Sequence, residues 1–388
     1  MFPYSKQSIN QKDISAIFKV LNSDFLTQGT QVPKFENKIK NLVKAKYGIA
    51  VNSASSALHI ACLALGLKKD DNVWTVPNTY AASVNCAINC GAIIDFVDID
   101  KSTWNISVEK LELKLRSVSK KKLPKIVIPV HFAGQPTEQK RIWYLSKKYG
   151  FKIIEDASHS LGASHFNEPV GSCRWSDITV FSFHPVKIIT TAEGGMATTN
   201  NKKLAEKMRI YRSNGITKNP NMFVYKKKNQ PWYYEQQTFG FNFRMNDISA
   251  ALGLSQLQRL KKFVKKRNMI ANLYRKELKN YPIKFQKIHK YNSSSYHLFI
   301  IKIDLKNSKY SYKQIFNKLR SKNIYVNLHY MPLHCSPYFK KKGFKLNQFP
   351  VSENYSQCSM SIPIYFDLNV KRVIKISNLI KKFFKKID

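Results

Sequence analysis

Hydrophobic positions follow two alternating patterns along the first half of the chain. Short apolar runs predict strands, and stretches with an apolar residue every three or four positions predict helices. The predicted strands span residues 47–52, 72–76, 93–97, 125–130, 151–156, 178–183 and 196–199. The helices predicted around them span residues 13–21, 32–46, 57–65, 80–89, 138–149 and 202–211. Apolar strands separated by helices indicate an α/β fold with a mostly parallel sheet that is covered on both faces.

A long stretch without apolar periodicity, residues 212–247, interrupts this alternation. A loop of that length is typical of a functional segment or of a mobile one. The spacing that follows predicts one long amphipathic helix over residues 248–278, which would bridge to a second unit. Two further strands and two further helices are predicted over residues 295–303, 324–327, 312–322 and 370–384. We therefore expect a large domain over residues 1–250 and a smaller C-terminal α/β domain over residues 251–388.

The composition fits a globular chain of this kind. Hydrophobic residues make up 43% of the 388 residues, and there are only 14 glycines and 15 prolines, so the chain can bury a large core. We expect neither a signal peptide nor a membrane span, because no apolar run is long enough. The cysteines are scattered; Cys86 and Cys90 could share a helix face, but no nearby ligand completes a metal set. Free thiols, no metal and a cytoplasmic location are expected.

Charge is the feature that could point to another class of protein. The chain has 65 Lys and Arg against 24 Asp and Glu, a net charge of +41, which favours anionic ligands and keeps nucleic-acid binding as an alternative. The basic residues nevertheless form short, separate clusters, such as residues 120–122, 226–228 and 340–342. No basic recognition helix, zinc set or RNA-binding aromatic motif accompanies them. We therefore expect a solvated basic surface and no nucleic-acid partner.

One lysine, Lys187, lies in the short segment between the apolar runs 178–183 and 196–199. Desolvation lowers the pKa of a lysine, and a less protonated amine can attack a carbonyl carbon. Lys187 is therefore a candidate Schiff-base lysine. The alternative is an ordinary solvated loop lysine.

Polar residues follow other predicted strands at their carboxyl ends, where open parallel sheets bind ligands. Ser53, Ser55 and Ser56 precede a small-residue helix, an arrangement that either binds phosphate at the helix N-terminus or simply caps the helix. Asp156 ends a strand, and its carboxylate could pair with a protonated ring nitrogen or cap the next turn. His159 could likewise donate to a ligand oxygen or cap that turn.

Four motifs carry a more specific signal when they are taken together. They are Asn-Ser-Ala-Ser-Ser-Ala-Leu at 52–58, Glu-Asp-Ala-Ser-His at 155–159, Ser-Phe-His-Pro-Val-Lys at 182–187 followed by Glu-Gly-Gly, and Gly-Phe-Asn-Phe-Arg-Met-Asn-Asp at 240–247. In this order and spacing the chain resembles the DegT-type sugar aminotransferases, which are pyridoxal-phosphate enzymes of fold type I. The resemblance extends over nearly the whole chain. Residues 20–29, 189–195 and 329–334 are similar to the subgroup that acts in pseudaminic acid synthesis.

The resemblance implies roles for the residues that match the family's motifs. Lys187 would bind the cofactor, pyridoxal 5'-phosphate, and would move the proton during transamination. Asp156 would keep the pyridine nitrogen of the cofactor protonated, which lets the ring act as an electron sink. His159 would contact the ring hydroxyl, and Tyr80 would stack on the ring. Relatives often have glutamine in the place of His159 and Trp or Phe in the place of Tyr80.

The resemblance also implies a shared active site. Ala54, Ser55 and Ser182 match residues that hold the cofactor phosphate. Asn242 matches a phosphate contact that the neighbouring subunit supplies, so a homodimer is implied. Arg244 is a further candidate for binding the substrate.

The implied reaction moves the amino group of L-glutamate to the C4 ketone of a nucleotide-linked sugar. The expected sugar is a UDP-linked 4-keto-6-deoxy-N-acetylhexosamine, and other nucleotide-linked 3- or 4-keto sugars are the alternative. His329 and His334 lack metal-ligand company in the sequence, so we expect substrate or structural roles for them. Sugar dehydratases of the family have histidine in place of the cofactor lysine. Because this chain has Lys187 there, transamination is favoured.

Overall fold

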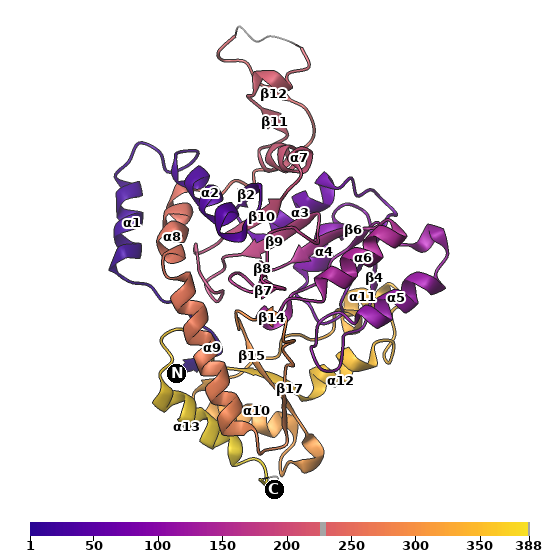
Figure 1. The fold of residues 1–388 in the computed structure, drawn as a ribbon, viewed down its shortest axis with the longest axis vertical. Helices are drawn as coiled ribbons and strands as arrows, with labels where there is room; N and C mark the ends of the chain where they lie inside the picture. The colour runs from indigo at the N-terminus through magenta and orange to yellow at the C-terminus, as the bar shows by residue number, and fades with distance from the viewer. Residues whose placement is uncertain (226–229, 387–388) are drawn as a thin grey trace.

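A computed structural model describes residues 1–225 and 230–386, so the basic cluster at 226–228 lies outside the described residues. Its central element is a seven-stranded sheet with the order β2-β10-β9-β6-β5-β3-β4 (Figure 1). Only β10 runs antiparallel to its neighbours; the other pairs in this sheet are parallel. The strands are β2 (Tyr47–Val51), β3 (Asn72–Thr75), β4 (Ile93–Phe96), β5 (Ile126–Val127), β6 (Lys152–Asp156), β9 (Ile178–Ser182) and β10 (Gly195–Thr199). The predicted, mostly parallel sheet is therefore confirmed.

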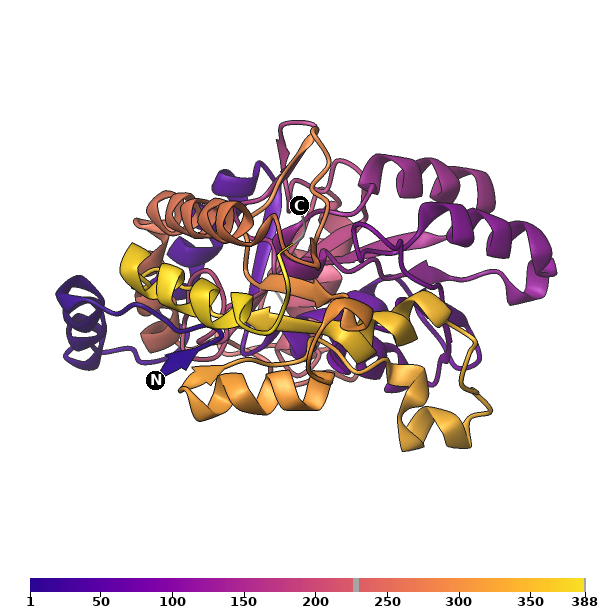
Figure 2. The same ribbon diagram turned by 90° about the horizontal axis from the view of Figure 1, so that it is seen from below.

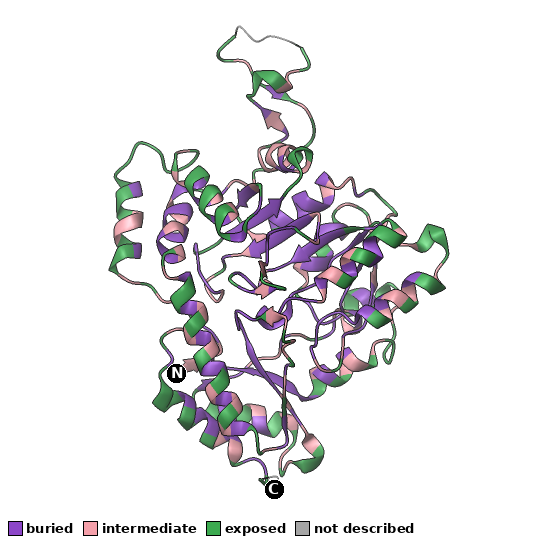
Figure 3. Cartoon of the chain, viewed as in Figure 1, coloured by how far each residue is buried: buried purple, intermediate pink, exposed green. Residues whose placement is uncertain are grey.

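Helices cover both faces of this sheet. This is seen from neighbouring residues of one strand, which point to opposite faces and pack into separate cores. Ile154 packs in a cluster with residues of α3, α4 and α7, whereas Ile153 packs with residues of α5 and α6. Figure 3 shows the strands as the most continuously buried part of the molecule. The helices around the sheet are α2 (Gln31–Val43), α3 (Ala54–Ala64), α4 (Ala82–Ile88), α5 (Val108–Ser117), α6 (Gln139–Tyr149) and α7 (Lys202–Arg212).

A second, smaller unit lies below the large sheet in Figure 1 and in front of it in Figure 2. Its antiparallel sheet has the order β13-β15-β17. The segment around Tyr4, near the N-terminus, runs beside this sheet. Its strands and helices are β13 (Ile283–Phe285), β15 (Phe299–Ile303), β16 (Ile324–Tyr325), β17 (Ser359–Ile362), α9 (Leu260–Leu278), α10 (Tyr312–Ser321), α11 (Pro337–Lys341), α12 (Pro350–Cys358) and α13 (Val370–Lys381). The N-terminal strand β1 (Phe2–Pro3) pairs with β16, so the first residues of the chain join this unit. The division into residues 1–250 and 251–388 stays a prediction.

The prediction of one helix over residues 248–278 was wrong. The segment forms two helices, α8 (Asp247–Leu257) and α9, which are separated at Gln258 and Arg259. The side chains of Gln256 and Arg259 both bind Asp13 of α1 (Gln11–Leu21) and the carbonyl of Ser8. Contacts with the N-terminal segment therefore hold the chain at the bend, and a local sequence pattern does not contain them.

The long segment after α7 is partly regular. β11 (Ile216–Thr217) pairs with β12 (Glu235–Gln236), and this ribbon projects from the body of the molecule (Figure 1). A small three-stranded sheet of β7 (Ser164–His165), β8 (Glu168–Pro169) and β14 (Asn292–Ser293) lies elsewhere on the molecule. In the part of the chain that the structure describes, no helix is both long and apolar enough to cross a membrane.

Candidate active site

A cavity of about 630 Å³ lies at the carboxyl ends of the parallel strands. Asp156 ends β6, Ser182 ends β9, and Tyr80 follows β3. Most of the residues predicted for the site line this cavity, namely Ala54, Ser55, Tyr80, Asp156, His159, Ser182, Lys187 and His329. The fold therefore gathers in one place residues that the sequence separates by more than half of the chain.

Lys187 is half-buried at this cavity and does not lie on the open surface. Its loop is compact, because the Lys187 amide donates to the carbonyl of His184 (2.9 Å) and the Thr191 amide donates to that of Phe183 (3.0 Å). Burial lowers the pKa of Lys187 to about 8, against the opposing pull of the Asp156 carboxylate. A substantial fraction of the amine is therefore uncharged slightly above neutral pH, as a nucleophilic or proton-accepting lysine requires.

Asp156 has a hydrogen-bond donor for each carboxylate oxygen. Ser83 Oγ donates to Oδ2 (2.6 Å) and the Ser158 amide donates to Oδ1 (3.1 Å). The residue is only 5% exposed, so these donors compensate for the water that the carboxylate has lost. Sequence reasoning missed Ser83, although its place in the first turn of α4, one turn after Tyr80, was a usable signal.

His159 is buried and makes contacts through both ring nitrogens. Nδ1 accepts from the Ala133 amide (3.3 Å), which assigns the proton to Nε2, and Nε2 lies 3.2 Å from the hydroxyl of Tyr330. Burial, with a smaller effect from the charge of Lys187, holds the pKa of His159 well below its usual range. His159 is therefore a neutral imidazole in this site. Tyr330 was absent from the predicted site residues, although it lies within the motif at 329–334.

The turn between β2 and α3 has the features of an anion site. Ser53 caps α3, since its hydroxyl accepts from the Ser56 amide (3.1 Å). The amides of Ala54 and Ser55 have no acceptor within the helix, and both residues line the cavity. Gly195 of β10 passes so close that an added Cβ would lie 2.5 Å from the Ser53 carbonyl. Ser53 therefore caps α3, while the amides of Ala54 and Ser55 at the same helix N-terminus stay available to an anion.

Tyr80 lies at the rim of the cavity. Its side chain is 64% exposed, and its ring is 6.2 Å from that of Tyr330 at an angle of 49°. His329 is buried instead, and its Nδ1 lies 2.8 Å from Ser361 Oγ. Burial, together with the charge of Lys187, lowers the pKa of His329 to about 3. An exposed aromatic ring and a neutral histidine thus both line the cavity.

Three predicted site residues do not line the cavity of their own chain. Asn242 is exposed and forms an isolated antiparallel β-bridge with Ser213. Arg244 forms such a β-bridge with Val51, beside the turn that precedes α3. His334 is fully buried elsewhere and lies 3.0 Å from the carboxylate of Glu353. The single chain therefore brings neither Asn242, Arg244 nor His334 to Lys187.

His334 has neighbours that the sequence did not reveal. Its Nε2 lies 3.3 Å from Cys335 Sγ, and the potential ligand atoms of His334, Cys335 and Glu353 all lie within 4.8 Å of one another. The Glu353 carboxylate also accepts from the amides of Asn347 and Phe349. These contacts tie the segment after His329 to the start of α12, which gives His334 a structural role.

Comparison with known proteins covers almost the whole chain. Residues 7–381 match the DegT/DnrJ/EryC1/StrS aminotransferase family. The chain is 37% identical over 372 residues to the UDP-4-amino-4,6-dideoxy-N-acetyl-beta-L-altrosamine transaminase of Campylobacter jejuni, covering 96% of this chain and 94% of the relative.

Solved structures agree with this match. PseC of Helicobacter pylori, an aminotransferase involved in the biosynthesis of pseudoaminic acid, superimposes with a TM-score of 0.89 and 30% identity over 99% of each chain. The PLP form of Spr1654 from Streptococcus pneumoniae gives a TM-score of 0.88 with 26% identity over 98% of this chain and 97% of its own. The predicted fold type I architecture is confirmed. The chain belongs to the DegT/DnrJ/EryC1/StrS aminotransferase family.

Proposed function

We propose that this protein is a pyridoxal 5'-phosphate-dependent transaminase that moves the amino group of L-glutamate to the C4 ketone of a UDP-linked 4-keto-6-deoxy-N-acetylhexosamine, in pseudaminic acid biosynthesis. The observation that carries the proposal is the single cavity that unites Lys187, Asp156 and the open N-terminus of α3. Pyridoxal phosphate has an aldehyde, a pyridine nitrogen and a phosphate. These need, respectively, an amine with a lowered pKa, a carboxylate and an anion site.

The cavity residues fit this cofactor in position and in chemistry. Ala54, Ser55 and Ser182 would hold the phosphate, and Asp156, whose oxygens are already held by two donors, would face the pyridine nitrogen. Tyr80, exposed at the rim, offers a ring face for stacking, and His159 offers its Nε2 proton. When bound, pyridoxal phosphate withdraws electrons from the carbon that loses its proton. Lys187 Nζ would accept that proton and return it, because its pKa lies near the working pH.

The small number of positively charged side chains in the cavity supports a homodimer with shared active sites. Among the described residues, the cavity is lined by one lysine, the exposed His184 and no arginine, and burial keeps His159 and His329 neutral. L-Glutamate has two carboxylates, and a nucleotide diphosphate sugar has two phosphate charges, so both need cationic partners. Asn242 and Arg244 lie outside the cavity of their own chain. The family resemblance implies that a second copy supplies Asn242, and the same copy could bring Arg244.

The sugar substrate rests on similarity to the Campylobacter jejuni and Helicobacter pylori relatives. The alternative is another nucleotide-linked 3- or 4-keto sugar, which would use the same amine chemistry. Incubating the protein with L-glutamate and a panel of UDP- and dTDP-linked keto-sugars, followed by mass and NMR identification of the amino-sugar, separates these possibilities. We expect the UDP-linked N-acetylated 4-keto sugar to react fastest. Preferred turnover of a dTDP-linked sugar would replace the proposed substrate and keep the transaminase.

The cofactor is tested separately from the sugar. The protein should be yellow after reconstitution with pyridoxal phosphate, and Lys187→Ala should lack the visible band of the lysine-bound cofactor and fail to turn over. A colourless wild-type protein would remove the proposal. The six cysteines are all unpaired, which agrees with a cytoplasmic setting for the reaction.

A further inference from the structure

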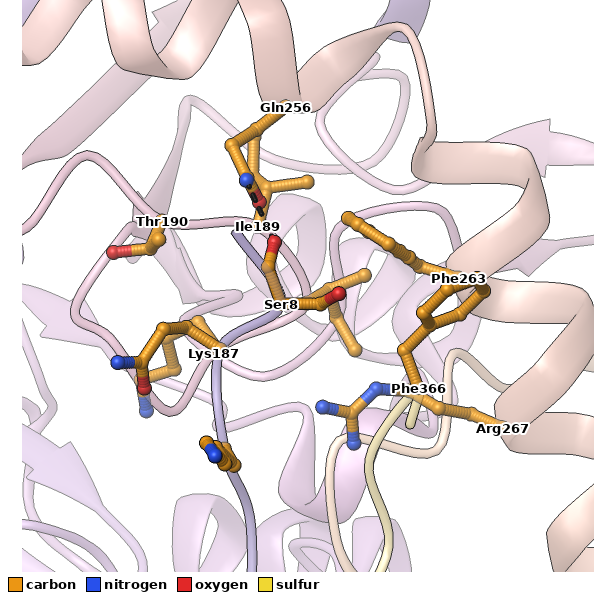
Figure 4. Close-up of a pocket in the computed structure, with 11 residues that line it drawn as sticks. Ser8, Lys187, Ile189, Thr190, Gln256, Phe263, Arg267 and Phe366 are labelled. Carbon is orange, nitrogen blue, oxygen red and sulfur yellow. Dashed lines mark hydrogen bonds between the residues drawn. The ribbon is translucent and has the colours of Figure 1, made fainter. Parts of the chain in front are cut away.

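The N-terminal segment passes between the small unit and the loop that carries Lys187. β1 pairs with β16, and the carbonyl of Tyr4 accepts from the Ile364 amide (2.9 Å). Further along, the carbonyl of Ser8 accepts from Gln256 Nε2 (3.0 Å). Figure 4 shows this segment, marked by Ser8, running between Lys187 and Arg267. The space that remains behind Lys187 is about 10 Å³, enough for no more than one water molecule.

Ser5 is the residue of this segment that contacts the lysine loop. Its hydroxyl donates to the carbonyl of Val186 (2.8 Å), and the residue is 5% exposed. That carbonyl belongs to the same peptide group as the Lys187 amide, which donates to the carbonyl of His184 (2.9 Å). Both polar atoms of the peptide group before Lys187 are therefore held. A planar group fixed at both ends determines where the Cα of Lys187 lies.

Arg267 of α9 determines the direction of the Ser5 hydroxyl. Its Nη2 donates to Ser5 Oγ (3.2 Å), and because a guanidinium cannot accept a hydrogen bond, the Ser5 proton is left for Val186. Nη1 donates to three backbone carbonyls, those of Tyr296, His297 and Ile364. Burial lowers the pKa of Arg267 only to about 10, so the side chain is charged at neutral pH.

Arg267 is buried, and neutral hydrogen-bond acceptors, Ser5 Oγ among them, hold its guanidinium. The side chain is 2% exposed, and in the described parts of the chain no carboxylate forms an ion pair with it. A buried guanidinium needs every donor satisfied by a well-placed acceptor. Four such acceptors come from three separate segments, so Arg267 locks together the N-terminal segment, the residues just before β15 and the residues just after β17.

We propose that Ser5, oriented by Arg267, is a positioning residue for Lys187. Ser5 holds the peptide group before the lysine so that Nζ points into the cavity, and it links the small unit to the reacting amine. The proposal rests on the proposed function only in that Lys187 is taken to be the reacting amine. The competing explanation is that the contact merely anchors the N-terminus.

The test compares Ser5→Ala, Ser5→Thr and Ser8→Ala in the full chain. Ser5→Ala removes the hydroxyl, and Ser5→Thr restores one. Ser8→Ala is the matched control, because within residues 1–225 and 230–386 its hydroxyl hydrogen-bonds only to the exposed Asp367 (3.3 Å) and its carbonyl is retained. Two readouts are taken: amide hydrogen exchange of residues 183–191 by mass spectrometry without cofactor, and kcat and KM for L-glutamate with cofactor.

We expect Ser5→Ala to exchange faster over residues 183–191 and to lose about tenfold or more in kcat with little change in KM, since a small displacement of a reacting group lowers the rate steeply. Ser5→Thr should recover both values, and Ser8→Ala should match the wild type. Unchanged exchange or unchanged kcat in Ser5→Ala overturns the proposal, as does an equal effect of Ser8→Ala. If the wild type itself shows no transamination, the proposed function fails, and the exchange data alone decide the role of Ser5.

Discussion

Lys187 shows how two neighbours with opposite effects set the chemistry of one amine. Burial disfavours its charged form, the Asp156 carboxylate favours it, and the pKa settles at about 8. Without burial, the amine would be almost entirely protonated at neutral pH and unable to accept a proton. The carboxylate prevents the opposite outcome, an amine too weakly basic to take the proton from its substrate.

Replacement of the carboxylate should move this balance in a known direction. Asp156→Asn removes the negative charge that raises the pKa of Lys187, so the pKa should fall below its present value. Only the uncharged amine reacts with the aldehyde of pyridoxal phosphate, so the rate of cofactor attachment should rise with pH and reach its plateau above about pH 8 in the wild type. In Asp156→Asn the plateau should begin at lower pH, as measured from the visible band by stopped-flow absorbance.

Glu193→Gln is the control for this experiment. Glu193 also lines the cavity, but its side chain is 68% exposed, so water screens its charge. Its removal should leave the midpoint of the pH profile within about 0.3 units of the wild type. A plateau that moves to higher pH in Asp156→Asn would contradict the electrostatic account.

At the scale of elements, contacts between distant segments decide where helices begin and end. α8 and α9 separate where Gln256 and Arg259 turn toward Asp13 of α1. The Asp13 carboxylate is fully buried and also accepts from Ser255 Oγ (2.6 Å). α1 therefore buries an aspartate, while its apolar residues Ile14, Phe18 and Leu21 are more than half exposed. The amphipathic pattern of α1 alone would assign the opposite face to the core.

Loss of the Asp13 carboxylate should destabilise the fold at this junction. Asp13→Ala would leave the buried donors of Ser255, Gln256 and Arg259 without their acceptor, which costs about 3–5 kcal/mol when a buried ion pair is broken. Urea unfolding followed by circular dichroism measures this loss. The matched control is Glu112→Ala, which breaks a solvent-exposed pair with Arg116 on α5 and should change the stability by about 0.5 kcal/mol or less. Equal effects of both substitutions would contradict the assignment of a buried network.

At the scale of the whole molecule, the rim of the cavity is exposed, and some of the predicted site residues lie outside the cavity. Tyr80 is exposed at the rim, and the cavity takes no arginine from its own chain among the described residues. Asn242 and Arg244 do not line that cavity; Asn242 pairs with Ser213, and Arg244 pairs with Val51. The ribbon of β11 and β12 projects from the body nearby in the sequence (Figure 1). The proposed completion of the site by a second copy would account for both the open rim and the unused residues.

Mixed dimers test whether active sites are shared. Lys187→Ala and Asn242→Ala should each be inactive alone, because each destroys both sites of its own homodimer. After subunit exchange in an equal mixture, half of the dimers are mixed and each of these has one intact site, so about a quarter of wild-type activity should return. If the mixture stays inactive although native mass spectrometry detects mixed dimers, Asn242 does not complete the partner's site.

The regular alternation of the large sheet and its helices could be predicted because burial leaves a local trace. A strand covered on both faces needs a short apolar run, as in β6 and β9, and the seven predicted strands all occur. The cavity followed from the same pattern, because Asp156 and Ser182 end β6 and β9, Tyr80 lies in the loop after β3, and these strands end at one edge of the sheet. Ser83 and Tyr330 had weak local signals, the first turn of α4 and the motif at 329–334, but their contacts with Asp156 and His159 appear only in the folded chain.

The sequence by itself determined the fold class, the family and the lysine, aspartate and serine positions of the site, because each is encoded in periodicity or in a contiguous motif. The tertiary structure alone decided the contacts that fix these residues in place. Ser5 meets Val186 across 181 residues, and Asp247 binds the first amide of α2 across 216 residues. Hydrogen bonds between such distant positions leave no motif or periodic pattern in the sequence. They can be identified only after the segments have packed together.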